Sequence, residues 1–334
     1  MINERNTIDK YQFYNRLERS GALFDVAASK FDSKHMSIQL DTGKIIDPTI
    51  ITRPEWISQK IELQTKTTED ENQDVKTDVN QKGLNKLQSR IEKTNANEIF
   101  DGEVLATTDI SDGIIKSGPV SYYTVASHRE LYTDSLVEEI LEKQRKEASR
   151  KLNDIDKKYS LIGITHTTVI DSPDDSNTYI LLGKRSKEMT SLAGFNCCCP
   201  AGLLEQKHYT ESNGTIESTV EQHFKDELTE EVFSNTVNET QIESSDLTVE
   251  VTGVGIDPLR YATEIASTVT VTGDLAKQLL NERDFIINGE YSRISPILST
   301  VVSNSLLLDK LSPQSQFSLG LYFVNNGTGN IVYE

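Results

Sequence analysis

The segment from Cys197 to Phe233 reads C-C-C-P-A-G-L-L-E-Q, then K-H-Y-T-E-S-N, then G-T-I-E-S-T-V-E-Q-H-F-K-D-E-L-T-E-E-V-F. Its glycine turn leads into a predicted helix that carries Glu227, Glu230 and Glu231. Positions i, i+3 and i+4 share one face of a helix, so the three carboxylates are expected to project together. Because like charges at this spacing destabilise a helix, the pattern favours a bound cation, and a hard divalent metal ion is the usual one.

An apolar stripe beside this acidic face is expected to hold the helix against a sheet. It is formed by residues spaced by four, namely Val220, Phe224, Leu228 and Val232. Segments rich in β-branched residues predict strands at residues 159–170, 178–183, 247–255 and 264–272. Further helices are predicted from Asp274 to about Glu282 and from Ser295-Pro296, a good N-cap and first-turn pair, to about Leu311. This order of elements predicts an α+β fold in which a mixed β-sheet lies between helices.

The order of residues in this segment resembles the Nudix box. The matching positions are Pro200-Ala201-Gly202, Glu205, Gly214, Glu217, Glu227-Leu228 and Glu230-Glu231. In the Nudix hydrolase superfamily, a glycine loop and a helix bind magnesium for hydrolysis of a diphosphate linkage. The resemblance covers about residues 158–310 and implies a Nudix-like fold, because a predicted strand pair that ends in basic residues also precedes the box.

The resemblance implies a Nudix-type pyrophosphohydrolase acting on a nucleoside diphosphate derivative, with ADP-ribose or a sugar nucleotide favoured. Glu227, Glu230 and Glu231 would bind Mg²⁺, with Mn²⁺ as the alternative ion. Glu230 and Glu264 would be catalytic, because a glutamate beside the metal positions or deprotonates the attacking water. The basic residues expected to contact substrate phosphates are Lys184 and Arg185.

Departures from the family's pattern leave other functions open. Asp226 stands where the family has an arginine that braces the glutamates, Phe233 replaces a glycine, and an insertion separates Gln206 from Gly214. The first alternative is therefore a catalytically degenerate Nudix-fold module that binds a nucleotide or regulates a partner. A second alternative is an enzyme like isopentenyl-diphosphate isomerase, because the segment Phe195 to Cys199 is similar to one that precedes the box in that group.

Plain structural roles compete with the functional ones for several residues. His223 is interpreted as a helix-surface histidine, and His166 as a hydrogen-bonded core residue. An exposed carboxylate at a strand end is the alternative for Glu264. The run Cys197 to Cys199 is interpreted as buried thiols, because side chains alternate along a strand and cannot all face one metal ion.

Residues 1–157 are predicted to form an N-terminal extension of unknown role, and residues 158–334 the Nudix-like domain. Residues 59–98 are polar and lack aromatic side chains, which predicts a disordered or loosely helical linker with a helical turn or two at its end. Elsewhere in the extension, strands are predicted at residues 36–40, 100–106 and 118–125, and a charged helix from Asp134 to about Lys157.

Composition limits the classes of partner. The 334-residue chain has a formal net charge of −18, which argues against binding to nucleic acid or to an anionic membrane. Its three consecutive cysteines offer no disulfide framework. The first residues, M-I-N-E-R-N-T, contain no apolar signal segment. We therefore expect a cytoplasmic protein whose partner is a small nucleotide substrate, and a homodimer is left open.

Overall fold

The computed structural model describes residues 34–58, 60–65, 81–94, 102–111, 113–129, 160–186, 194–233, 242–257, 260, 262–281, 291–304 and 307–333. The helix predicted from Asp134 to about Lys157 lies outside these residues, as do residues 66–80 of the predicted linker.

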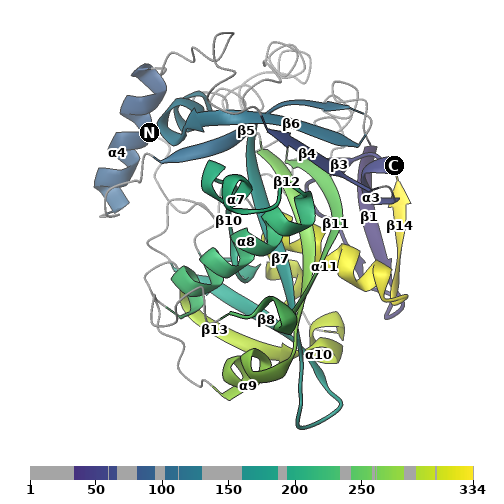
Figure 1. Cartoon of the computed structure of the whole chain (residues 1–334). Coiled ribbons are helices and arrows are strands. Elements are labelled where there is room, and N and C mark those ends of the chain that lie inside the picture. The colour runs from purple at the N-terminus through teal and green to yellow at the C-terminus, as the bar shows by residue number, and fades with distance from the viewer. Residues whose placement is uncertain are drawn as a thin grey trace.

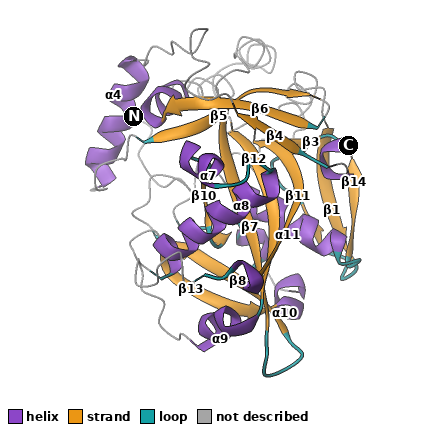
Figure 2. Ribbon diagram, in the orientation of Figure 1, coloured by secondary structure: helices purple, strands orange, loops and turns teal. Residues whose placement is uncertain are grey.

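One mixed sheet runs through the described part of the chain (Figures 1 and 2). The strands on its main path, in chain order, are β1 (Lys34–Leu40), β3 (Ile51–Thr52), β4 (Glu62–Thr65), β5 (Glu103–Ser111), β6 (Ile114–Ser121), β7 (Ser160–Asp171), β11 (Leu247–Asp257), β12 (Ala262–Val271) and β14 (Gly329–Tyr333). Their order across the sheet is β14-β1-β3-β11-β12-β7-β5-β6-β4. The strands off this path are β2 (Ile45–Ile46), β8 (Thr178–Arg185), β9 (Asn196–Cys198), β10 (Ala201–Leu203) and β13 (Tyr291–Leu298).

Helices cover both faces of the central strands β7 and β12, which pair in parallel. The helices are α3 (Glu55–Ser58), α4 (Gln81–Thr94), α7 (Gln206–Glu211), α8 (Ile216–Glu227), α9 (Gly273–Asn281), α10 (Ser299–Asn304) and α11 (Pro313–Asn325), with helical residues also at 122–129. Ile164 of β7 and Ile265 of β12 belong to a buried cluster with Val220 of α8. Their strand neighbours face the other way, so Ala266 packs with Phe317 of α11. Figure 1 shows α8 in front of these strands and α11 behind them.

The predicted α+β class is confirmed, and so are the strands that form β7, β8, β11 and β12 and the short helix α9. The helix predicted from Ser295 to about Leu311 is wrong. Ser295 and Pro296 lie inside β13, opposite Leu182 and Leu181 of β8, and the chain then forms α10 and a 3₁₀ turn at Leu308–Lys310. Proline cannot donate a ladder hydrogen bond, and β13 pairs with β8 alone, so this edge position tolerates it.

Two described parts of the predicted linker are ordered, Glu62–Thr65 as a strand and Gln81–Thr94 as a helix, which corrects the expectation of disorder for these residues. Within it, β4 pairs in parallel with β6, and α4 is longer than the one or two turns expected. Leu87 of α4 is fully buried, and Gly83 approaches the backbone of Ser127 so closely that a Cβ would lie 1.9 Å from its carbonyl oxygen. A few apolar residues are enough to hold α4 in place, because Gly83 has no side chain and lets the helix pack closely against the backbone of Ser127.

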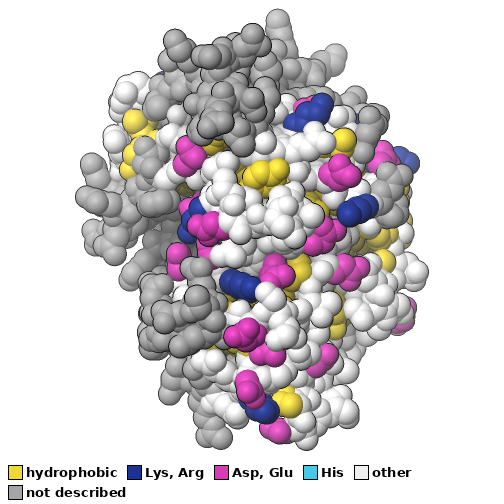
Figure 3. Space-filling view, in the orientation of Figure 1, with side chains coloured by type: hydrophobic (Ala, Val, Ile, Leu, Met, Phe, Trp, Pro, Cys, Tyr) yellow, Lys and Arg dark blue, Asp and Glu magenta, His cyan; other side chains and the backbone are white. Residues whose placement is uncertain are grey.

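Charges on the described part of the surface are mixed. Figure 3 shows acidic side chains spread over the face that carries α8, with basic side chains between them. No helix in the described part of the chain is both long enough and apolar enough to span a bilayer.

Candidate functional site

The helix of the box segment forms as the sequence predicts. Thr215 precedes α8, and its Oγ1 accepts a hydrogen bond from the Ser218 backbone N–H at 3.3 Å, which satisfies one of the free donors of the first turn. All four residues of the predicted apolar stripe are fully buried against the sheet: Val220, Phe224, Leu228 and Val232. The stripe thus fixes which face of the helix is left for polar side chains.

A π-helical segment at Leu228–Val232 follows α8 directly and changes where the glutamates point. A π-turn inserts one residue into the helical repeat, so the i, i+3, i+4 geometry assumed from the sequence does not hold across it. Glu227 is partly exposed, Glu230 is exposed, and Glu231 is buried. The three predicted metal ligands therefore have three different environments.

Glu231 connects the helix of the box segment to β10, the strand that contains Gly202, and to β13. Its Oε2 accepts hydrogen bonds from the Ala201 backbone N–H at 3.1 Å and from the Tyr291 hydroxyl at 3.2 Å. Burial, together with the negative charge of Glu231, raises the pKa of Tyr291 well above its usual value, so the phenol keeps its proton. The guanidinium of Arg185 lies 5.6 Å from the centre of the Tyr291 ring. The structure thus brings Arg185 and Glu231 together through Tyr291, whereas Lys184 is exposed.

Glu227 packs against the backbone of Gly202. A Cβ at Gly202 would lie 2.1 Å from Glu227 Oε1, so any larger residue here would require this carboxylate to move. Glu227 Oε1 also lies 3.6 Å from Nε2 of His223. The Pro-Ala-Gly strand and the box helix, which an insertion separates along the chain, are therefore in contact through both Glu227 and Glu231.

The insertion itself supplies the groups that face Asp226. His208 accepts the Glu205 backbone N–H on Nδ1 at 3.0 Å, so the ring proton of neutral His208 resides on Nε2, which lies 3.0 Å from Asp226 Oδ2. The ammonium of Lys207 lies 3.5 Å from the same oxygen. Burial opposes ionisation of Asp226, but the contact with His208 and the charge of Lys207 outweigh it and lower the pKa of this carboxyl.

Lys207 also neutralises other carboxylates of this surface. Its ammonium lies 3.6 Å from Glu205 Oε2. Burial alone would lower the pKa of Lys207, but the charges of Glu205, Asp226 and Glu230 outweigh this and raise it. Part of the repulsion expected on the acidic helix face is thus relieved by a lysine of the chain itself.

A buried chain of polar groups runs from the sheet to Glu227. Ser267 Oγ lies 2.7 Å from His166 Nδ1, and His166 Nε2 lies 2.8 Å from His223 Nδ1. Burial lowers the pKa of His166 to about 3 and that of His223 well below its usual value, so both rings are neutral at physiological pH. The interpretation of His166 as a hydrogen-bonded core residue is confirmed. The interpretation of His223 as a surface histidine is wrong, because its side chain is fully buried beneath the helix.

Glu264 lies on the opposite face of the sheet from the box helix. It pairs with Gly163 of β7, and its neighbours Thr263 and Ile265 point to the α8 side. The structure therefore does not place Glu264 beside the box glutamates. Its carboxylate is buried and lies 3.2 Å from the guanidinium of Arg260, so it is not the exposed strand-end group considered as its alternative role.

All three cysteines are buried free thiols, which confirms the structural interpretation of this run. Burial raises the pKa of Cys197 and raises that of Cys198 to about 12, so both keep their protons at neutral pH. A thiolate, the form needed for acid–base or nucleophilic work, is therefore disfavoured here.

The residues fit a magnesium ion only in part. In the described part of the chain, no three histidine, cysteine, aspartate or glutamate side chains lie together so as to hold a metal ion. Glu231 in particular is buried, and its Oε2 already accepts hydrogen bonds from Ala201 and Tyr291. Magnesium, however, is usually held by one or two carboxylates and completed by substrate phosphates and water, so the partly exposed Glu227 and the exposed Glu230 are the carboxylates of the box that such a smaller site would use.

Sequence reasoning missed Tyr291, Lys207 and His208. The insertion departs from the pattern of the box, but it places two basic side chains, Lys207 and His208, shortly before an acidic helix, and this spacing is a signal that they could neutralise the helix. Tyr291 follows residues 282–290, which the structure does not describe, and only the pairing of β13 with β8 places it near Glu231.

Comparison with known proteins leaves the family of this chain unassigned. No protein-family model and no curated protein matches it. Among solved structures, it is similar to a mutT/Nudix family protein from Listeria innocua, with 18% sequence identity and a TM-score of 0.33 over 50% of this chain and 94% of the other. A MutT/Nudix family protein from Enterococcus faecalis has 11% identity and a TM-score of 0.28 over 52% of this chain and 55% of the other. Both TM-scores are low, so the proposals below rest on the residues and their contacts.

Proposed function

We propose that this protein hydrolyses a diphosphate linkage in a nucleoside diphosphate derivative. The observation that carries the proposal is the contact between the two halves of the box segment. Glu231 accepts a hydrogen bond from Ala201 at 3.1 Å, and Glu227 occupies the space beside Gly202. These halves are separated in sequence by the insertion that contributes to α7. Their contact in the folded chain supports the proposal that they form a single site.

Within this proposal the residues have distinct roles. Glu230, whose side chain is exposed, positions or deprotonates the attacking water. Arg185, beside Tyr291, contacts a substrate phosphate, and Lys184 adds a second positive charge. A magnesium ion held by Glu227 and Glu230 would polarise a phosphoryl oxygen. Glu231 has a positioning role, because it holds Ala201 and Tyr291 in place.

Turnover assays test this proposal. The purified chain is incubated with ADP-ribose, sugar nucleotides and other nucleoside diphosphate derivatives, in Mg²⁺ or Mn²⁺, and phosphate release is measured after phosphatase treatment. Glu230→Gln should lower kcat by at least about a hundredfold, the lower range for loss of a general base, with an unchanged melting temperature. The matched control is Glu211→Gln, which neutralises an exposed carboxylate at the end of α7 and should keep wild-type turnover.

A second candidate function is a nucleotide-binding module without turnover. It is favoured by the burial of Glu231 and by the position of Lys207, whose charge relieves the need for a metal ion. No turnover of any panel member, together with saturable binding of one of them, would establish this function and reject the hydrolase. Turnover that is equal in Glu230→Gln and wild type would reject the assignment of Glu230.

A further inference from the structure

Three fully buried side chains on separate elements form a hydrogen-bonded series, here called the histidine relay, that leads to Glu227. Its members are Ser267 on β12, His166 on β7 and His223 on α8. The distances are 2.7 Å from Ser267 Oγ to His166 Nδ1 and 2.8 Å from His166 Nε2 to His223 Nδ1. A buried polar network is costly unless each of its atoms is satisfied, so the atom at the end of the relay decides what the relay can do.

The end of the relay is Nε2 of His223. Within the described residues this buried atom has no hydrogen-bond partner at normal distance and angle, and it lies 3.6 Å from Glu227 Oε1. The backbone carbonyl of Leu203 is a further acceptor for this ring. Because an ionised carboxylate and a carbonyl only accept hydrogen bonds, the proton of the neutral His223 ring belongs on Nε2.

This proton sets the direction of every hydrogen bond in the relay. With Nε2 of His223 protonated, its Nδ1 accepts, so His166 donates from its own Nε2. The Nδ1 of His166 then accepts, and the hydroxyl of Ser267 donates to it. Both rings are neutral at physiological pH, because burial lowers the pKa of His166 to about 3 and that of His223 well below its usual value. The relay therefore presents one N–H toward Glu227.

Ring contacts hold the two imidazoles in this orientation. The centre of the His223 ring lies 5.0 Å from that of His166 and 4.9 Å from that of His208. The ring of Phe224, from the apolar stripe, is nearly perpendicular to that of His166, with their centres 5.2 Å apart. The direction of the N–H is thus fixed by packing as well as by hydrogen bonds.

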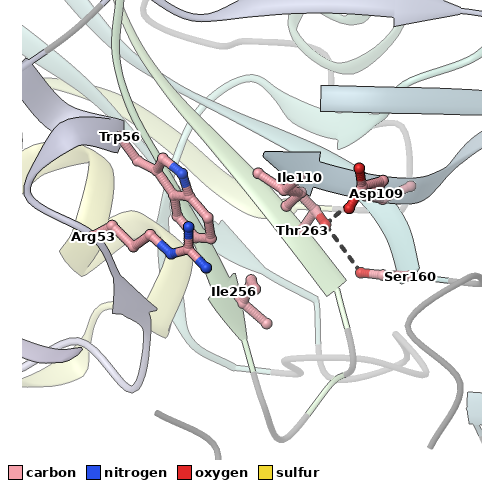
Figure 4. Close-up of a pocket in the computed structure, with 8 residues that line it drawn as sticks. Arg53, Trp56, Asp109, Ile110, Ser160, Ile256 and Thr263 are labelled. Atoms are coloured by element: carbon pink, nitrogen blue, oxygen red, sulfur yellow. Dashed lines mark hydrogen bonds between the residues drawn. The ribbon is translucent and has the colours of Figure 1, made fainter. Parts of the chain in front are cut away.

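Glu227 is the group through which the relay can act on a ligand. The three members of the relay have no exposed surface, whereas 15% of the Glu227 side chain is exposed. The pocket shown in Figure 4, between Arg53 and β5, is lined by other residues, so a molecule bound there would not contact the relay.

We propose that Ser267, His166 and His223 are positioning residues that direct one N–H at Glu227 and fix the place of its carboxylate. A small movement of this carboxylate turns the contact into a hydrogen bond, and such contacts commonly tighten when a ligand binds. Glu227 is then held between the N–H of His223 and the backbone of Gly202. The expected effect on turnover rests on the proposed function, in which Glu227 binds the metal ion.

Nitrogen NMR of the full chain with ¹⁵N-labelled histidine tests the relay independently of turnover. His166 and His223 should each carry the proton on Nε2, a tautomer that the ¹⁵N shifts of the two ring nitrogens identify. Glu227→Gln should shift the Nε2 resonance of His223, and the control Glu230→Gln should leave it in place. The other tautomer in either ring would overturn the proposal, as would a His223 resonance that is the same in Glu227→Gln and wild type.

Variants of His166 separate positioning from packing. His166→Leu leaves Nδ1 of His223 without its donor, so the Mg²⁺ concentration for half-maximal turnover should rise about tenfold, the lower range for loss of a partner of a metal ligand. His166→Gln keeps one acceptor and one donor and should stay close to the wild type. The KM for the nucleotide should be unchanged in both variants. An equal rise in the two variants would show that the ring only fills space.

A matched pair of buried serines completes the test. Ser267→Ala should raise the Mg²⁺ requirement several-fold. Ser318→Ala should not, because the Ser318 hydroxyl donates to the carbonyls of Thr165 and Ser267 instead of to a histidine. Equal effects on the Mg²⁺ requirement would reject the role of the relay in turnover. A wild-type chain without any turnover would reject the proposed hydrolysis, and the histidine resonances then decide the positioning role alone.

Discussion

Among single residues, Glu264 is expected to make stability depend on pH. Burial raises its pKa from 4.5 to about 7, an effect that Arg260 opposes and Asp257 reinforces. The folded state thus favours the protonated carboxyl, so the stability is intact below pH 4.5 and is lost as the pH rises through about 7. One pKa unit corresponds to about 1.4 kcal/mol, so the loss is on the order of a few kcal/mol.

Glu264→Gln should remove this dependence. The free energies of unfolding in urea, measured at pH 5 and pH 8, should be similar for variant and wild type at the lower pH and higher for the variant at the higher pH. The comparison between the two proteins cancels the contribution of the buried histidines His166 and His223, because burial lowers their pKa values in both proteins. A variant that loses as much stability as the wild type over this range would show that Glu264 ionises normally.

At the scale of elements, the packing of α8 on β10 depends on a missing side chain. Gly202→Ala would place a Cβ 2.1 Å from Glu227 Oε1, and the flexible carboxylate end must then move. We expect turnover or nucleotide binding to fall at least tenfold, with only a small decrease in melting temperature. Gly118→Ala in β6, where a new Cβ meets no atom within 4 Å, is the control and should affect neither. Equal effects of the two substitutions would show that the position of Glu227 does not matter for turnover or nucleotide binding.

The elements predicted from the sequence are those that local patterns determine. The β-branched runs of β7 and β12 and the four-residue stripe of α8 each carry their own period, so they were found. β13 was missed because Ser295-Pro296 is a good local helix start, and only pairing with β8 makes it a strand. α11 was missed as well, since its burial on both sides removes the amphipathic pattern.

In the candidate site, too, local sequence patterns predict some features, whereas contacts between distant segments determine the others. The sequence indicates which side chains the box helix carries, but not the π-helical segment that turns Glu231 inward. Nor does spacing reveal that Lys207 and His208 from the insertion would face Asp226. Glu264 is expected near the helix because the resemblance implies a catalytic glutamate beside the metal, whereas the alternation of side chains in β12 directs it to the opposite face.

At the scale of the whole molecule, one sheet joins the two ranges expected to be separate. β3 pairs with β11, β5 with β7, and β1 with β14. A fragment of residues 158–334 would lose these partners and leave strand edges unpaired. We therefore expect the fragment to lack a cooperative urea transition, whereas the full chain should unfold in one. A fragment with a sharp transition and dispersed amide resonances would show instead that residues 1–157 are an independent extension.

The pairing of β1 with β14 also bears on how the chain folds as it is synthesised. Met36 lies opposite Tyr333, so the two strands are roughly 300 residues apart along the chain, and closing such a loop is slow compared with local folding. Until β14 emerges from the ribosome, the outer edge of β1 is a bare row of hydrogen-bonding groups in a crowded cell. Nascent chains should therefore bind chaperones until β14 has been synthesised and has paired with β1.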